Sequence, residues 1–130
     1  MRFLVDYNLT GDALLLEETL ITEGWLELFS IRFLIFKDVG LPMESSDRVV
    51  WDFAQANQMI LLTANRNMKG DDSLEQTMRE QNTATSLPII TIGNPDRMDE
   101  NIYRQQCALR LIDILINLEH YLGAGRLFIP

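Results

Sequence analysis

The sequence predicts an α/β protein in which a mostly parallel sheet is covered by helices on both faces. Two observations support this: short apolar runs recur along the chain, and a segment with helical signals follows each of the first four. An uninterrupted apolar run of about four to eight residues is typical of a strand buried on both faces of a parallel sheet. Strands that alternate with helices form such sheets through right-handed crossovers. We therefore expect a three-layer α/β/α sandwich around a sheet of four or five strands.

The first third of the chain contains one complete strand–helix–strand unit. The first strand is expected at residues 3–5, where three apolar residues run directly into a carboxylate. Thr10 or Asp12 can cap a helix that continues through residues 13–21. Residues 31–36 are rich in β-branched and aromatic side chains, which favour a second strand.

The middle of the chain repeats this unit. Residues 37–42 form a turn-rich segment before the next helix. Ser45, Ser46 or Asp47 can cap that helix, which carries an apolar face. Residues 60–63 then predict a third strand that is short and buried.

The last part of the chain supplies two more strands and the longest helix. Ser73 and Gln76 have capping-box spacing, so a helix is expected to begin there. Residues 88–92 predict a fourth strand and residues 127–129 an edge strand, with a helix from about residue 99 to 122 between them. The apolar face of this helix contains Ile102, Leu109, Ile112, Leu115, Ile116 and Leu118. That face is wider than one sheet surface requires, so we expect part of it to be covered in a homodimer.

Composition restricts the class of protein. The 130 residues suit a single domain, 1–130, and the net charge of −8 opposes nonspecific binding of nucleic acid by the whole surface. A lone cysteine, Cys107, excludes an internal disulfide and a cysteine zinc site. No apolar run approaches the ~20 residues of a membrane span, and no signal-peptide pattern is present, so the expected location is cytoplasmic.

Several common catalytic motifs are absent from the sequence. It contains neither the G-x-G-x-x-G of dinucleotide-binding turns nor the G-x-x-x-x-G-K-[ST] of phosphate-binding loops. It also lacks the G-x-S-x-G elbow, and the single histidine, His120, lies late in an apolar helix. These absences argue against nucleotide-dependent enzymes and against a serine or cysteine hydrolase.

What remains is a series of carboxylates and amides that follow the expected strands. Asp6 follows the first strand, Asp47 opens the helix after the second, and Asn65 follows the third, with Asp71 and Asp72 shortly before the next helix. The carboxyl ends of parallel strands share one edge of the sheet, where ligands usually bind. Crowded carboxylates repel unless a cation neutralises them, and hard oxygen donors suit Mg²⁺ or Mn²⁺. Such ions activate water and stabilise the charge that develops in phosphodiester cleavage.

A simpler interpretation stays open for each acid taken singly. Asp12, Asp47 and Asp72 are all suitable helix caps, and Asp6 can cap the helix that follows it. Asp38 lies in a turn, where aspartate is common. On this interpretation the acids stabilise local structure and bind nothing.

Residues 3–9 are similar to the motif FLVDENL, and residues 60–66 to the motif VLVTRDKDF. Residues 36–41 and 46–51 are similar to two further motifs in the same order and spacing. In these four segments the chain resembles the PIN-like protein family, in particular a small bacterial group within it. The resemblance implies a PIN-type α/β/α sandwich whose acidic pocket binds Mg²⁺ or Mn²⁺ and cleaves RNA. Many such proteins are toxins, which implies an antitoxin-like protein as a possible partner.

The resemblance also implies roles for individual residues. Asp6 is the first metal ligand, and Asp47, or Glu44, is the second acid. The family has aspartate at the third position, where this chain has Asn65, so metal affinity and water activation are expected to fall. Asp71 or Asp72 can supply the missing charge, and Asp71 is the third ligand that we expect.

Three further residues are expected to contact substrate: Asn8, Arg66 and Lys69. The expected function is therefore a metal-dependent ribonuclease. The alternative is a PIN-like binding or assembly module without nuclease activity, which Asn65 and the acidic surface favour. A receiver-type protein phosphorylated on Asp6 is disfavoured, because the fourth strand is followed by Gly93 and Asn94 and not by lysine.

Overall fold

A five-stranded sheet, with every strand parallel to its neighbours, forms the centre of the protein. The computed structural model describes residues 1–65 and 73–130. The strands are β1 (Arg2–Val5), β2 (Arg32–Leu34), β3 (Ile60–Thr63), β4 (Ile89–Ile92) and β5 (Arg126–Ile129). They pair in the order β2-β1-β3-β4-β5, with Phe3 of β1 opposite Phe33 of β2 and Ile60 of β3. The expected parallel sheet is confirmed.

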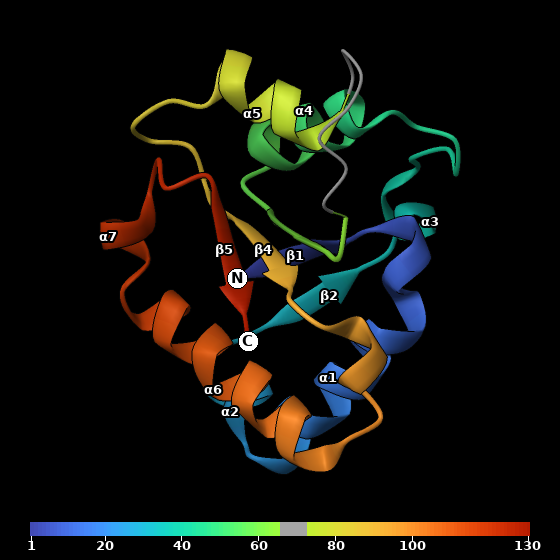
Figure 1. Ribbon diagram of the computed structural model, residues 1–130, viewed down its shortest axis with the longest axis vertical. Helices are drawn as coiled ribbons and strands as arrows, with labels where there is room; N and C mark the ends of the chain where they lie inside the picture. Colours follow the sequence, from blue (N-terminus) through green and yellow to red (C-terminus); the bar gives the residue numbers. More distant parts are fainter. Residues whose placement is uncertain (66–72) are drawn as a thin grey trace.

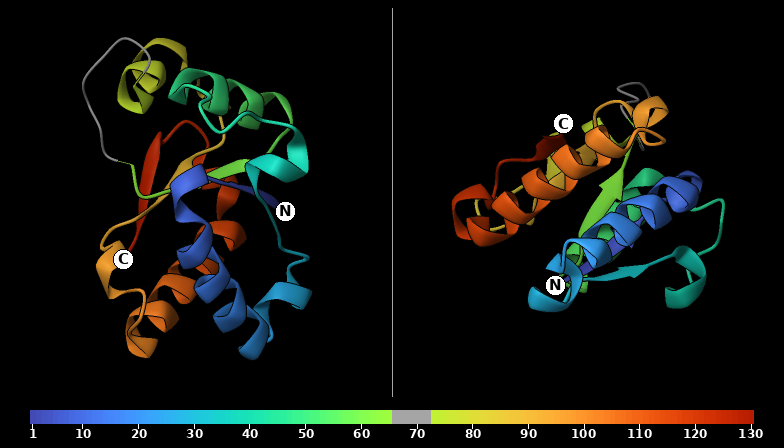
Figure 2. Two further views of the ribbon diagram at one scale, coloured as in Figure 1. Left: turned by 90° about the vertical axis from the view of Figure 1, so that its right-hand side faces the viewer. Right: turned by 90° about the horizontal axis from the view of Figure 1, so that it is seen from below.

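Helices cover both faces of this sheet and make the three layers that the sequence predicted (Figures 1 and 2). The α-helices are α1 (Thr10–Thr22), α2 (Trp25–Leu28), α3 (Phe36–Val39), α4 (Asp47–Ala56), α5 (Leu74–Gln81), α6 (Asn101–Ile116) and α7 (Leu118–Tyr121), and two 3-10 turns are η1 (Tyr7–Leu9) and η2 (Pro95–Arg97). Helix α1 packs beside α6 on one face, and α4 packs beside α5 on the other. No helix within the described residues is long and apolar enough to cross a membrane.

The apolar runs of the strands follow from burial on both faces. Successive strand side chains point to opposite sides of a sheet. Phe3 and Val5 therefore join the core beneath α1 and α6, whereas Leu4 joins the core beneath α4 and α5. In β3, Leu62 and Leu61 divide between the two cores in the same way. Burying one such side chain contributes about 1.5–3 kcal/mol, so both faces select apolar residues.

Two helix starts were predicted from their caps. The Ser46 hydroxyl accepts a hydrogen bond of 3.2 Å from the Val49 N–H at the start of α4. The Ser73 hydroxyl accepts one of 3.2 Å from the Gln76 N–H at the start of α5. The reciprocal half of the capping box does not form, because the Gln76 side chain donates to Glu80 Oε1 at 2.8 Å.

The second strand is shorter than predicted. It ends at Leu34, and the residues expected to finish it and to form a turn make the helical turn α3. The Ile35 N–H donates to Asp38 Oδ2 at 3.0 Å, and Gly40, with φ of 76°, ends the turn. Phe36 is buried in the same core as Leu4. A buried helical turn and a buried strand need the same apolar residues, so the prediction was wrong at this boundary.

The last helix breaks at Asn117, although one helix was predicted from about residue 99 to 122. The Asn117 side chain donates to the main-chain oxygen of Asp113 at 3.0 Å, and α7 begins after it. Of the predicted apolar face, Ile112 is buried in the core, whereas three residues are exposed. Those exposed residues are Ile102, Leu109 and Ile116.

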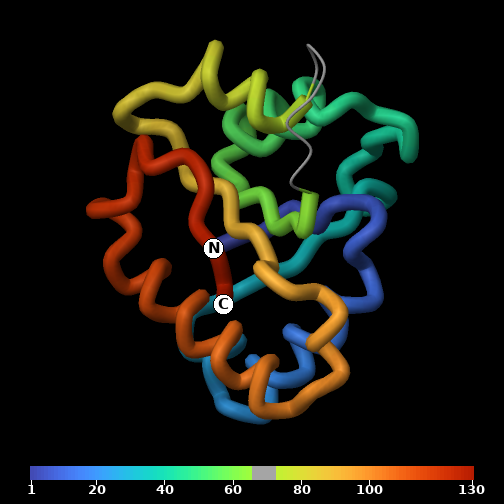
Figure 3. The backbone as a smooth tube through the Cα atoms, in the orientation of Figure 1, coloured from blue at the N-terminus to red at the C-terminus, as the bar shows by residue number. Residues whose placement is uncertain are grey.

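The strand order creates a switch point beside β1. Strand β1 lies beside β3 in the middle of the sheet (Figure 3). From β1 the chain continues through α1 to β2 on one side, whereas from β3 it continues through α5 to β4 on the other side. In open α/β sheets, ligands bind outside the carboxyl ends of the strands at such a reversal. A ligand site is therefore expected among the residues that directly follow β1 and β3.

Candidate functional site

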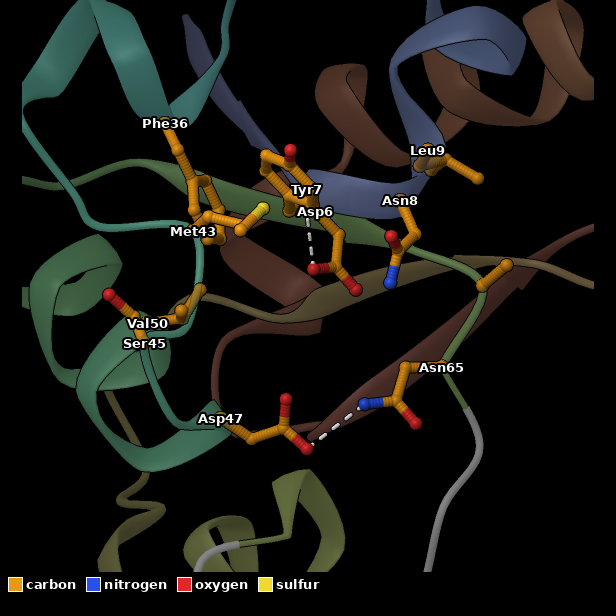
Figure 4. A pocket seen from close by; sticks show the side chains of 11 residues that line it. Asp6, Tyr7, Asn8, Leu9, Phe36, Met43, Ser45, Asp47, Val50 and Asn65 are labelled. Atoms are coloured by element: carbon orange, nitrogen blue, oxygen red, sulfur yellow. Dashed lines mark hydrogen bonds between the residues drawn. The ribbon is translucent and has the colours of Figure 1, made fainter.

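A pocket of about 410 Å³ lies beyond the carboxyl ends of β1 and β3 (Figure 4). This volume falls within the ~300–1,000 Å³ of ordinary ligand sites. The described residues that line it are Asp6, Tyr7, Asn8, Leu9, Phe36, Met43, Ser45, Asp47, Val50, Ala64 and Asn65. Four predicted site residues, Asp6, Asn8, Asp47 and Asn65, are thus brought together.

Asp6 directly follows β1 and both caps a helix and faces the pocket. Its Oδ1 accepts a hydrogen bond of 2.8 Å from the Tyr7 N–H at the start of η1. Its Oδ2 accepts one of 2.7 Å from the hydroxyl of Thr63, a fully buried residue at the end of β3. Asp6 therefore caps the helical turn and also lines the pocket, so both interpretations of this residue hold together.

Asp47 is the first residue of α4 and joins three elements at the pocket. Its Oδ2 accepts a hydrogen bond of 2.9 Å from the side-chain amide of Asn65 and one of 3.2 Å from the Leu74 N–H. Figure 4 shows its carboxylate across the pocket from that of Asp6. Asn65 follows β3 and Leu74 begins α5, so Asp47 fixes the relation of both to α4.

The surroundings of Asp47 work against its negative charge. Burial makes the largest contribution and raises the pKa of this carboxyl above its usual value, and the negative charge of Asp6 raises it further. The hydrogen bonds from Asn65 and Leu74 and the charge of Arg126 act in the opposite direction but do not cancel the rise. A carboxyl with a raised pKa that faces a second carboxylate inside a pocket is typical of functional sites.

Arg126 supports the pocket from the last strand, and sequence reasoning missed it. Its Nη1 donates to the main-chain oxygen of Asn65 at 2.8 Å and to the Thr91 hydroxyl at 2.6 Å. Its Nε donates to Glu75 Oε1 at 2.7 Å, and its side chain is 10% exposed. A cation at the start of an otherwise apolar strand was the available signal, because an arginine that becomes buried is usually paired.

The remaining predicted residues divide into two groups. Glu44 is exposed and does not line the pocket, so Asp47 is the acid of that pair that faces it. Four predicted residues lie outside the described part of the chain: Arg66, Lys69, Asp71 and Asp72.

The donor set of the pocket fits a hard cation. Asp6, Asp47 and the amide oxygen of Asn65 supply the oxygen atoms that Mg²⁺ and Mn²⁺ prefer. A carboxylate oxygen that accepts one hydrogen bond keeps a further lone pair for an ion. Within residues 1–65 and 73–130, however, no group of three or more acidic, histidine or cysteine side chains is placed to hold a metal.

One wall of the pocket is apolar, which the sequence did not indicate. Tyr7, Phe36 and Met43 lie together at one end of the pocket in Figure 4. None of the described residues that line the pocket is cationic.

Comparison with known proteins gave no match, whether to a protein-family model, to a curated protein or to a solved structure.

Proposed function

We propose that this protein is a Mg²⁺- or Mn²⁺-dependent ribonuclease of PIN-like type, with Asp6 and Asp47 as ligands of the ion. The observation that supports this most is the meeting of these two carboxylates in one pocket at the switch point of the sheet. The negative charge of Asp6 raises the pKa of Asp47, and a divalent cation bound between the two carboxylates would remove this repulsion. The family resemblance of residues 3–9 and 60–66 supports the same assignment.

Each residue of the pocket has a proposed role. Thr63 orients Asp6 through its hydroxyl, and Asn65 orients Asp47 through its amide. When bound, the cation lowers the pKa of coordinated water and offsets the negative charge of the phosphodiester. Asn8 lines the pocket and is proposed to contact the substrate. Outside the described residues, Arg66 and Lys69 are the proposed phosphate contacts, and Asp71 and Asp72 the proposed further acids.

The test is cleavage of single-stranded RNA by the purified protein with Mn²⁺. Asp6→Asn and Asp47→Asn are isosteric and each is expected to abolish cleavage. Asp113→Asn is the matched control, because Asp113 is an exposed residue near the end of α6 that does not line the pocket. Cleavage that persists in both pocket variants would come from a contaminant and would contradict the proposal.

A second candidate function is a PIN-like binding or assembly module without nuclease activity. It is favoured by the amide of Asn65, which faces Asp47 where the family has a carboxylate. Titration calorimetry separates the two candidates. Heat of Mn²⁺ binding that disappears in Asp6→Asn supports the ribonuclease, and no heat in the wild-type protein supports the module.

Self-association and an antitoxin-like protein partner extend the proposal. Ile102, Leu109 and Ile116 recur at intervals of seven residues and are all exposed, so they lie along one side of α6. An exposed apolar row of this kind is typical of a protein interface. It supports the homodimer that the sequence predicted.

A further inference from the structure

The lining of the pocket combines two kinds of chemistry. Asp6, Asp47 and Asn65 supply carboxylate and amide groups, whereas Tyr7 and Met43 contribute exposed apolar surface at the end of the pocket where Asp6 lies (Figure 4). Tyr7 is 45% exposed and Met43 is 60% exposed. Large side chains of this kind contribute little to folding when they stay in water. Their placement in the wall of the acidic pocket needs another explanation.

The Tyr7 side chain is partly exposed, and its ring contacts a neighbouring aromatic ring. Tyr7 begins η1 and directly follows Asp6, whose carboxylate accepts a hydrogen bond from the Tyr7 N–H. Its ring lies against that of Phe36, with 6.1 Å between centroids and 51° between planes. Phe36 is buried in the core with Leu4 and Val50. A buried ring thus supports an exposed ring beside the carboxylate of Asp6.

This arrangement fits the base of a single-stranded nucleic acid. Proteins recognise single-stranded RNA by stacking its splayed bases on aromatic side chains. Such stacking is tolerant of sequence, because every base has a π-face. It also suits the charge of this protein: the net charge is −8 and no described pocket residue is cationic, so phosphate contacts from these residues add little. Tyr7 stands where the resembled family pattern has glutamate, so the aromatic ring is a feature of this chain.

We propose that Tyr7 is the platform on which one unpaired base of single-stranded RNA stacks, with the adjoining phosphodiester directed toward Asp6 and Asp47. The inference rests on the proposed ribonuclease function and names the residue that would hold a base of the single-stranded substrate. A duplex keeps its bases stacked and paired, so it presents none to the ring. Purines have larger π-faces than pyrimidines, and the platform therefore favours adenine over uracil.

The test is fluorescence anisotropy with labelled hexa-adenylate and hexa-uridylate in EDTA, where no divalent ion is present and the RNA stays intact. Wild-type protein is expected to bind hexa-adenylate more tightly than hexa-uridylate. Tyr7→Leu removes the ring and is expected to weaken adenylate binding by about 5- to 150-fold and to erase the preference. Tyr7→Phe keeps the ring and is expected to retain both properties. Equal binding of hexa-adenylate by wild type and Tyr7→Leu, or no binding by wild type, overturns the inference.

The two proposals fail in distinguishable ways. Adenylate binding that depends on Tyr7, together with no cleavage that depends on Asp6 and Asp47, keeps the base platform and rejects the ribonuclease. Cleavage that depends on both carboxylates, with the same KM and base preference in Tyr7→Leu, keeps the ribonuclease and rejects the platform. Thermal unfolding of each variant confirms that it folds, and Tyr7→Phe separates loss of the ring from loss of the fold.

Discussion

The side-chain amide of Asn65 donates a 2.9 Å hydrogen bond to Oδ2 of Asp47, and this contact limits the negative charge of the pocket. An aspartate at position 65 would place a carboxylate where the amide now contacts Asp47, and Asp6 lines the same pocket. Like charges at hydrogen-bond distance oppose ionisation and destabilise the fold unless a cation joins them. The hydrogen bond from Asn65 therefore stabilises the Asp47 carboxylate in the folded protein without a bound ion.

The variant Asn65→Asp tests this directly. In EDTA it is expected to lose about 1–3 kcal/mol of unfolding free energy, because a hydrogen bond is replaced by repulsion. Mn²⁺ is expected to restore more stability to this variant than to wild type, because an additional carboxylate strengthens its binding to the folded state. Denaturant unfolding in EDTA and in Mn²⁺ measures both effects.

The matched control is Asn101→Asp, which adds the same charge at the exposed start of α6, away from the pocket lining. It is expected to show no added response to Mn²⁺. An equal loss of stability by Asn65→Asp in both buffers would mean that no ion binds there.

A second prediction concerns Asp47 and pH. Burial and Asp6 raise the pKa of Asp47 in the folded protein, so the fold favours its protonated form. Ionisation of Asp47 therefore costs stability at pH values above the folded pKa, and this cost disappears as the pH falls through that pKa. The amide introduced by Asp47→Asn keeps an oxygen that accepts from Asn65 and Leu74. This variant is expected to match or exceed wild-type stability at pH 7, by at most about 1 kcal/mol after solvent screening.

Denaturant unfolding without divalent ions at pH 7 and at pH 4 checks the sign. The difference between Asp47→Asn and wild type is expected to shrink at the lower pH, where Asp47 takes up a proton. In Asp113→Asn the loss of a surface ion pair with Arg110 is expected to cost less than about 1 kcal/mol. A large loss of stability in Asp47→Asn at pH 7 would show that its charge stabilises the fold.

The polar half of the pocket was predictable from sequence, whereas the apolar half was not. Asp6 and Asn65 each follow an apolar run that predicts a strand. Parallel strands bring their carboxyl ends to one edge of the sheet, so the sequence pattern predicts that these two residues lie close together. Phe36 belongs to a run that fits a strand as well as a buried helical turn, which hid its place behind Tyr7. Arg126 reaches Asn65 only through the pairing of β5 with β4, a contact that no local pattern encodes.

A third prediction concerns the exposed row on α6. Leu109, at its centre, is 59% exposed, so its replacement does not disturb the core. If this row covers its counterpart in a second copy, Leu109→Glu places a charge in the interface and separates the copies. Light scattering after size-exclusion chromatography is expected to give a dimer mass for wild type and a monomer mass for Leu109→Glu. Leu28→Glu, at an exposed leucine of α2, is the matched control and stays dimeric. A monomeric wild type at high concentration would refute this.

The fourth prediction concerns the guanidinium of Arg126, which donates hydrogen bonds to a carboxylate, a main-chain oxygen and a hydroxyl. Arg126→Met leaves Glu75 without its ion pair and leaves the Asn65 carbonyl and the Thr91 hydroxyl without this donor. Breaking a largely buried pair in this way is expected to cost about 3 kcal/mol. Arg126→Lys keeps the charge but not the planar fork, so it is expected to recover only part of that loss.

Denaturant unfolding measures these losses, and the double variant Arg126→Met/Glu75→Gln separates their causes. It is expected to be more stable than Arg126→Met alone, because no partly buried carboxylate then remains without its ion pair. The surface pair of Arg97 and Glu100 provides the comparison, and Arg97→Met is expected to cost less than about 1 kcal/mol. If Arg126→Met loses no more than Arg97→Met, then Arg126 does not support the chain at Asn65, and the position of the pocket amide depends on β3 and α4 alone.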